Sequence, residues 1–260
     1  RRGRFAVGTG RRLILTTRTH MLPITNRLLA DNIGRGLFLT ENAADEATIY
    51  LYDVIVNDSS WGGISAIDFV RELAAAQVGT IHLRINSPGG EVFAAQAMAQ
   101  AVKEHPAKVV AHIDGLAASS ASWLALSADE VHIASGSMIM IHQAMTYAVG
   151  NAKDMHATAA MLEKIDRVLV DLYVEATGQT EERIAEWMAA ETWFSAQEAV
   201  DAGFASSIAT AEAKNLKAWN LSSYANAPPM GGSDKKSPDS HSPDNAHRHR
   251  LLSLSKALFD

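Results

Sequence analysis

The sequence has no cysteine among its 260 residues, and this absence excludes thiol catalysis, thiolate zinc sites and disulfide frameworks. It also lacks any run of 18 apolar residues, so no transmembrane helix and no membrane partner are expected. Acidic residues are missing from the first 20 positions, which carry six arginines, so the rest of the chain is more acidic than the net charge of -6 suggests. An acidic body argues against nucleic acid as the main partner.

Residues 1–20 form a basic leader that admits three interpretations. It is either a disordered basic arm, or a stretch upstream of a translation start at Met21 that the mature protein lacks. A targeting peptide is the third interpretation, because the leader contains arginine and threonine and no acid. Three glycines in this stretch weaken that interpretation, since they disfavour an amphipathic helix.

The body of the chain alternates predicted strands with predicted helices. Its 47% hydrophobic content and its length suit one sizeable domain that folds without metals or disulfides. The alternation is typical of βαβ units with a mainly parallel sheet, and Asp114 and Gly115 are expected to form a turn after the third strand. The expected strands are residues 48–56, 80–85, 108–113, 130–133 and 138–141, and the expected helices are residues 65–77, 92–104, 119–127, 152–176, 180–188 and a short one after Ser195.

The two ends of the chain differ in composition from this domain. Residues 21–47 are an N-terminal segment, and the domain is expected to span residues 48–225. Residues 226–250 are dense in polar residues and proline with almost nothing to bury, which predicts a disordered linker. Residues 251–260 regain apolar side chains at helical spacing and are expected to form a short C-terminal helix or tail.

Ser119, His142 and Glu191 are the candidates for nucleophilic catalysis. A serine nucleophile needs a base, a group that orients the base, and amide donors for the oxyanion. Spacing alone does not make these three residues a triad, because triads are defined by geometry and not by chain order. The G-x-S-x-G elbow of α/β-hydrolases is absent, so that family is not supported.

Four segments, taken in order, resemble the ClpP-like serine peptidases over residues 48–207. Residues 85–90 (Ile-Asn-Ser-Pro-Gly-Gly) resemble the oxyanion loop of that family, and residues 115–119 (Gly-Leu-Ala-Ala-Ser) resemble its nucleophile segment. Residues 140–143 (Met-Ile-His-Gln) are similar to its histidine segment, and residues 193–199 (Trp-Phe-Ser-Ala-Gln-Glu-Ala) to the stretch after its acid. Within the family, the chain looks most like the phage and prophage branch, which processes capsid and scaffold proteins during head assembly.

The resemblance implies an α/β fold of the ClpP/crotonase type, built from repeated ββα and βαβ units with a mainly parallel sheet and a long protruding helix. It implies a serine endopeptidase with Ser119 as nucleophile, His142 as general base and Glu191 as the orienting acid, where most bacterial housekeeping members have aspartate. The backbone N–H groups of Gly90 and Ser120 would form the oxyanion hole. Neither a metal nor a cofactor is implied.

Each assignment also has a competing interpretation. A serine before a helix can be a plain N-cap, and a histidine among apolar residues is more often a hydrogen-bonded core residue. A Pro-Gly-Gly sequence can be only a turn, and histidines in a polar tail are more often solvated than metal ligands. Ser120 or Ser122 could carry the exposed hydroxyl in place of Ser119, and Glu186 or Asp201 could be the acid in place of Glu191. Gly89 and Gly90 could form only a turn, and His247 and His249 are the histidines of the polar tail.

The resemblance also implies a homo-oligomeric ring that acts on protein or peptide substrates, with the helix at residues 152–176 contacting the opposite ring. The family's usual partner is an ATP-driven unfoldase. Residues 144–150 depart from the Pro-x-Gly-Gly type sequence that housekeeping members have after the histidine segment, which speaks against that partner. The expected activity is therefore ATP-independent or loosely regulated, in the cytoplasm of a bacterial host or within phage proheads.

Three other functions compete with this interpretation. A relative of the signal-peptide peptidases would share the Ser-Pro-Gly-Gly loop but use a lysine base, contrary to the motif at His142. A crotonase-type acyl-CoA enzyme would share the fold and an amide oxyanion hole without needing a Ser119–His142 pair. An assembly or scaffold protein on a peptidase fold, with little or only self-directed activity, is suggested by the polar linker and short helix of residues 225–260.

Overall fold

The computed structural model describes residues 23–34, 36–209 and 219–228. The basic leader, most of the expected linker and the expected helix at residues 251–260 lie outside these residues. Within the described part, no helix has both the length and the apolar character needed to cross a membrane.

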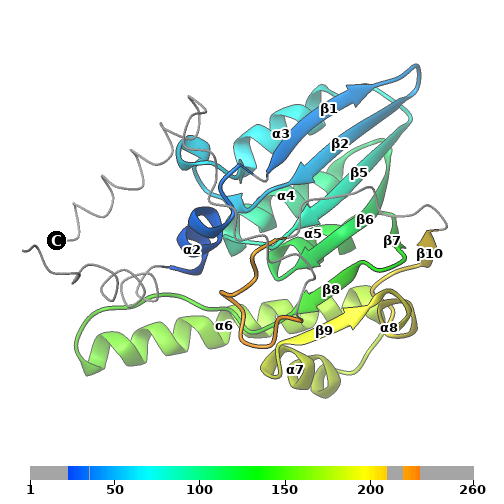
Figure 1. Cartoon of the computed structure of the whole chain (residues 1–260). Coiled ribbons are helices and arrows are strands. Elements are labelled where there is room, and N and C mark those ends of the chain that lie inside the picture. The colour runs from blue at the N-terminus through cyan, green and yellow to red at the C-terminus, as the bar shows by residue number, and fades with distance from the viewer. Residues whose placement is uncertain (1–22, 35, 210–218, 229–260) are drawn as a thin grey trace, which may run out of the picture.

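One sheet carries the fold, and most of its strands are parallel, as the sequence predicts (Figure 1). The strand order is β1-β2-β5-β6-β7-β10, and β8 pairs with both β6 and β9. β1 is antiparallel to β2, and β9 is antiparallel to β8, whereas the other pairs are parallel. The strands are β1 (Leu37–Asn42), β2 (Glu46–Tyr52), β5 (Thr80–Ser87), β6 (Lys108–Ala118), β7 (Glu130–Ala134), β8 (Met138–Ile141), β9 (Thr192–Ser195) and β10 (Ser207–Ala209).

Helices cover one face of the sheet and build the core there. Phe69, Met98 and Leu124, from three successive helices, are fully buried in the same cluster as Ile81 and Leu83 of β5. These helices are α3 (Ala66–Ala75), α4 (Val92–Glu104) and α5 (Ser120–Leu126). The remaining elements are α2 (Ile24–Asp31), β3 (Ile55–Val56), η1 (Ser59–Trp61), β4 (Ile64–Ser65), α6 (Ala152–Thr177), α7 (Glu181–Ala189) and α8 (Ala196–Asp201).

The long helix α6 protrudes from the sheet, as expected, and Figure 1 shows its N-terminal half extending beyond the strands. Asn151 begins it with a capping box, and Gly178 ends it in the left-handed conformation that glycine adopts without strain. Of its 26 residues, Leu169, Val170 and Tyr173 in the last third are buried. The N-terminal half therefore exposes apolar side chains that the described part of the chain does not cover.

Several local predictions are confirmed. The helix expected at residues 92–104 has those bounds as α4, and the strand expected at residues 138–141 is β8. Ser65 and Thr180 cap α3 and α7, because each hydroxyl accepts a hydrogen bond from a backbone N–H of the first helical turn. Local capping chemistry was therefore sufficient to predict these starts.

The turn predicted at Asp114 and Gly115 is wrong, because β6 continues through both residues to Ala118. Asp114 is buried and accepts hydrogen bonds from the hydroxyl of Tyr52 and the guanidinium of Arg84. Both partners lie on other strands of the same sheet. Their hydrogen bonds allow a residue that normally favours turns to stay inside a strand.

The boundaries around the first predicted strand also differ. Residues 48–56 do not form one strand: β2 ends at Tyr52, and residues 55–56 form β3, which pairs with β4 instead of the main sheet. The short strands β1, β9 and β10 were not expected. Each has only three to six residues and takes its place from pairing with another strand.

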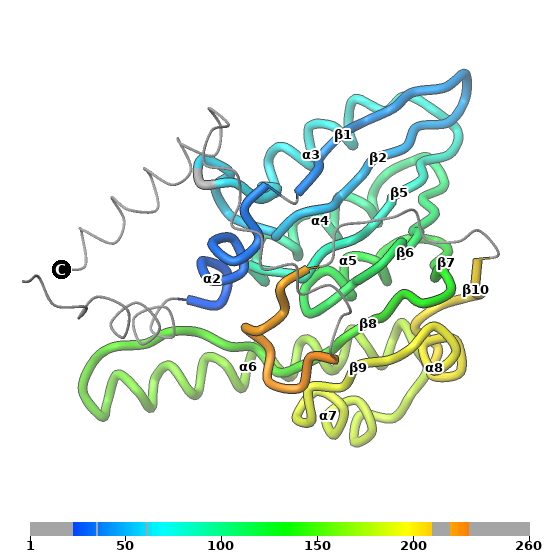
Figure 2. Tube along the Cα trace, viewed as in Figure 1, coloured from blue at the N-terminus to red at the C-terminus, as the bar shows by residue number. Residues whose placement is uncertain are grey.

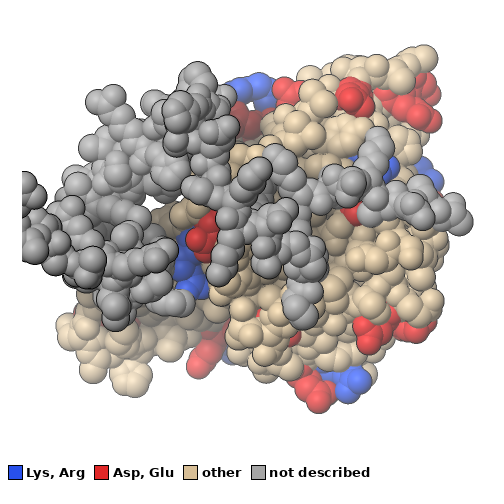
Figure 3. Space-filling model, in the orientation of Figure 1, with Lys and Arg blue, Asp and Glu red and all other residues tan. Residues whose placement is uncertain are grey.

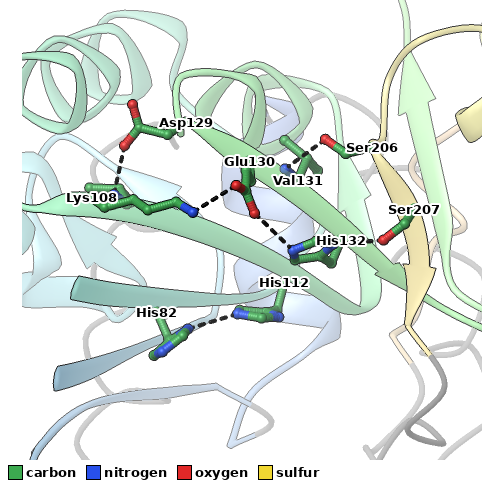
Figure 4. Close-up of polar contacts among 10 residues, drawn as sticks. His82, Lys108, His112, Asp129, Glu130, Val131, His132, Ser206 and Ser207 are labelled. Carbon is green, nitrogen blue, oxygen red and sulfur yellow. Dashed lines mark hydrogen bonds and ion pairs between the residues drawn. The ribbon is translucent and has the colours of Figure 1, made fainter.

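The opposite face of the sheet is polar. His82, His112 and His132 lie side by side on β5, β6 and β7, and Nδ1 of His82 is 3.0 Å from Nε2 of His112 (Figure 4). Lys108 pairs with Glu130 on the same face at 2.7 Å. On the side of the molecule shown in Figure 3, the visible Lys and Arg side chains of the described residues form small separate groups.

Candidate active site

Ser119 lies at the junction between the end of β6 and the start of α5. Its φ of 54° and ψ of −128° place a non-glycine residue in the positive-φ region, which costs conformational energy and is frequent at functional sites. Its backbone N–H donates to the carbonyl of Met140 at 2.8 Å, which ties the junction to β8. The Ser119 hydroxyl makes no capping hydrogen bond to α5, so Ser119 is not a plain side-chain N-cap.

His142 directly follows β8, which runs parallel to β6. The carboxyl ends of neighbouring parallel strands meet at one edge of a sheet, and this brings His142 to Ser119. Nε2 of His142 is 2.7 Å from Oγ of Ser119, a hydrogen bond between a nucleophile and a base. Burial lowers the pKa of His142 to about 4, with the Glu191 charge acting in the opposite direction. The imidazole is therefore neutral at pH 7 and able to accept a proton.

Glu191 lies in the tight connection between α7 and β9, with a positive φ of 49°. Its carboxylate accepts hydrogen bonds from the backbone N–H of Ala225 at 3.1 Å, the backbone N–H of Asn226 at 2.6 Å and the indole of Trp193 at 3.3 Å. Among the described residues, none of its hydrogen bonds goes to His142. Glu191 is thus close enough to influence the pKa of the histidine, but its role as the orienting acid stays a prediction.

Gly90 and Ser120, the expected oxyanion donors, line the same cavity as Ser119 and His142. Gly90 has a φ of 149°, and a Cβ atom there would lie 1.9 Å from the carbonyl oxygen of Ile55. The position therefore requires glycine because β3 passes so close to it. Ser120 is the first residue of α5, where backbone N–H groups have no partner within the helix.

The alternative residues are placed less favourably. Ser120 and Ser122 are buried, and the Ser122 hydroxyl hydrogen-bonds the Ser119 carbonyl and Tyr173. Glu186 pairs with Arg183 on the surface, and Asp201 accepts from Gln197. In the described part of the chain, no set of histidine, aspartate and glutamate side chains is arranged to hold a metal ion, and His247 and His249 lie outside that part.

The sequence did not predict that Tyr224 belongs to this site. Tyr224 lines the cavity, and its ring meets the ring of His142 edge-on with centroids 5.5 Å apart. Its hydroxyl donates to the carbonyl of Pro88 in the Pro-Gly-Gly loop. The one sequence feature that could have indicated a packed segment here is the presence of three large apolar or aromatic residues, Trp219, Leu221 and Tyr224, just before the polar tail.

Comparisons with known proteins identify a family for most of the described chain. Residues 39–212 match the family model of the Clp protease. The chain is 32% identical over 197 residues to the ATP-dependent Clp protease proteolytic subunit 1 of Corynebacterium jeikeium, covering 75% of this chain and 95% of that one. It is 31% identical over 189 residues to proteolytic subunit 2 of Corynebacterium glutamicum, covering 72% and 86%. A solved structure, that of a ClpP1 point mutant from Listeria monocytogenes, matches with a TM-score of 0.54 and 25% identity over 62% of this chain and 90% of that chain.

Proposed function

The chain belongs to the Clp protease family of serine endopeptidases, and on that premise we propose that it cleaves peptide bonds through an acyl-enzyme formed on Ser119. The observation that carries the proposal is the 2.7 Å hydrogen bond between Oγ of Ser119 and Nε2 of His142. A crotonase-type enzyme has no need of such a pair, and a lysine-dependent peptidase would use a different base.

In the proposed reaction, Nε2 of His142 removes the Ser119 proton while Oγ attacks the scissile carbonyl carbon. The negative charge that develops on the carbonyl oxygen is stabilised by the backbone N–H groups of Gly90 and Ser120. His142 then gives the proton to the leaving amine, and an acyl-enzyme remains. His142 then takes a proton from water, whose oxygen attacks the acyl carbon, and returns that proton to Oγ of Ser119 as the bond between the acyl carbon and Oγ breaks. Glu191 orients the imidazole during these steps.

Substitution of the nucleophile tests this proposal directly. Ser119→Ala should abolish fluorophosphonate labelling and lower peptide cleavage by roughly 10⁴- to 10⁶-fold, as losses of a serine nucleophile do. The labelled residue is identified by mass spectrometry, with Ser222→Ala, a change at an exposed serine, as the matched control. Labelling that persists in the Ser119→Ala protein would remove Ser119 from this role.

The natural substrates are proposed to be phage capsid or scaffold proteins, cleaved without an ATP-driven unfoldase. The motif resemblance to the phage and prophage branch supports this, as does the departure from the housekeeping pattern at residues 144–150. Co-expression with capsid and scaffold proteins should give shortened products that the Ser119→Ala variant does not make. Cleavage of folded substrates only in the presence of ATP and an unfoldase would contradict the proposal.

A further inference from the structure

Residues 219–228, called the strap below (orange in Figures 1 and 2), carry Tyr224 into the lining of the candidate active-site cavity. The indole of Trp219 donates to Oδ1 of Asn86, just before the Ser-Pro-Gly-Gly loop, at 3.1 Å. Asn220 exchanges two hydrogen bonds with Asn32 at the end of α2, with distances of 2.6 and 3.0 Å. Trp219, Leu221 and Tyr224 are buried in one cluster with residues of α2 and β8. The strap is therefore fixed to the structure by packing and hydrogen bonds.

Tyr224 of the strap occupies the approach to the nucleophile. Its side chain is 5% exposed and lies between Pro88, whose carbonyl it hydrogen-bonds, and the ring of His142. Burial raises the pKa of its hydroxyl. A substrate carbonyl must come within about 3–3.5 Å of Oγ of Ser119 to react. Tyr224 lines the same cavity as Ser119 and meets the ring of His142 edge-on, so it occupies space that a substrate needs on its way to Oγ.

The next two residues of the strap hold the expected acid. The backbone N–H groups of Ala225 and Asn226 donate to Oε2 and Oε1 of Glu191, and the side chain of Asn226 donates to the carbonyl of Ala190. A carboxylate that accepts two backbone N–H groups and an indole is held firmly in that orientation. In this arrangement, none of the hydrogen bonds that Glu191 makes with the described residues goes to His142.

We propose that the strap is an autoinhibitory segment, which fills the substrate approach with Tyr224 and withdraws Glu191 from His142 until it is displaced. This inference rests on the proposed function. The strap would inhibit in two ways: Tyr224 obstructs access of the substrate to Ser119, and the backbone of Ala225 and Asn226 holds the Glu191 carboxylate. Displacement of this one segment would remove both effects. Displacement also exposes His142 to water and frees Glu191, and both changes raise the pKa of the histidine toward its ordinary value.

Two strap variants test the proposal in the full chain. Tyr224→Ala removes the side chain that occupies the approach. Asn226→Pro removes a backbone donor to Glu191 at an exposed residue and leaves the cavity lining unchanged. Both variants should increase the rates of fluorophosphonate labelling at Ser119 and of peptide cleavage by about tenfold or more. The reason is that each substitution weakens the closed position of the strap and so raises the fraction of molecules in which the strap is displaced. Ser222→Ala, at an exposed strap residue without a side-chain contact to the site, should label at the wild-type rate.

A peptide of residues 219–228 should slow labelling of the Tyr224→Ala protein, and the same peptide with its tyrosine changed to alanine should not. Circular dichroism melting shows whether each variant is folded. Equal or slower labelling in both folded variants overturns the strap proposal but leaves the peptidase proposal standing, provided that the wild type is labelled at Ser119. If no protein that retains Ser119 is labelled, the proposed function itself fails and the strap proposal with it.

Discussion

Ser119 and Glu191 share a backbone feature: they are the two non-glycine residues with positive φ in the described part of the chain. Such conformations cost of order 1–3 kcal/mol each and persist only where the surroundings enforce them. At Ser119, the hydrogen bond of its N–H to Met140 and the start of α5 hold the hydroxyl towards His142. At Glu191, the contacts with the strap set the direction of the carboxylate.

Gly90 supports a prediction at this scale. Gly90→Ala should unfold more easily than the wild type and should lose activity, because the new Cβ atom would lie 1.9 Å from the carbonyl oxygen of Ile55. Gly136→Ala is the matched control, since Gly136 also has a positive φ but no heavy atom within 4 Å of an added Cβ. The control should lose only about 1 kcal/mol in the free energy of unfolding, measured by urea titration. Equal losses in the two variants would contradict the close approach of β3.

At the scale of elements, the helices and strands at the β8–β9 edge meet in one aromatic cluster. Phe204 contacts Tyr173 of α6, Trp187 of α7 and Phe194 of β9, with ring centroids 4.9 to 6.2 Å apart. Phe204 is fully buried and follows Gly203, which ends the α8 turn. This cluster fixes the positions of α7 and β9, and with them the connection that carries Glu191.

Phe204→Ala should therefore destabilise the protein by about 3–5 kcal/mol, the usual cost of replacing a buried phenylalanine with alanine. Phe93→Ala, at a phenylalanine with 64% of its surface exposed, should change the free energy of unfolding by less than about 1 kcal/mol. Denaturant titration of the two variants measures the difference. A small loss in Phe204→Ala would show that the cluster does not hold these elements.

At the scale of the whole molecule, two partly buried histidines link stability to pH. Burial lowers the pKa of His142 to about 4 and, with the charges of Arg84, His82 and His132 contributing, also lowers the pKa of His112 to about 4. Both values lie below the ordinary histidine value of about 6.5 that applies in the unfolded chain. As the pH falls from about 6.5 to about 4, the unfolded chain binds protons that the folded protein does not.

The free energy of unfolding should consequently decrease as the pH falls through this window. Below about pH 4, these two histidines should contribute no further decrease. Urea midpoints at pH 7, 5.5 and 4.5 measure the decrease. In His112→Gln the decrease should be smaller, because one of the two titrating groups is absent. A midpoint that does not fall between pH 7 and 4.5 in the wild type would contradict the burial of these rings.

Exposed apolar residues on α6 indicate a surface through which copies of this chain could associate. Met155, Met161 and Val168 are 37%, 46% and 48% exposed on this protruding helix. Exposed apolar side chains along one element often mark a protein contact, which supports the homo-oligomeric ring that the family resemblance implies.

Met161→Glu should therefore give a smaller species than the wild type in analytical ultracentrifugation, because it places a charge in the proposed contact. Glu163→Gln, at an exposed residue of the same helix, should leave the size unchanged. A wild-type protein that sediments as a monomer at all concentrations would contradict the ring.

The sequence by itself determined the features that depend on neighbouring residues. The alternation of strands and helices, the bounds of α4, the caps at Ser65 and Thr180 and the candidates Ser119 and His142 all follow from local patterns or short motifs. Capping and hydrophobic periodicity act within one or two helical turns, so they can be read without knowing the fold.

Only the tertiary structure decided the features that depend on distant segments. Asp114 stays within β6 because Tyr52 and Arg84 reach it from other strands, and no local rule contains those partners. Tyr224 lies 136 positions from Pro88 in the chain, yet packing of the strap against the Pro-Gly-Gly loop brings it into the cavity that Ser119 lines. The Glu191 carboxylate likewise accepts hydrogen bonds from the backbone of Ala225 and Asn226, which lie 34 and 35 positions away in the chain.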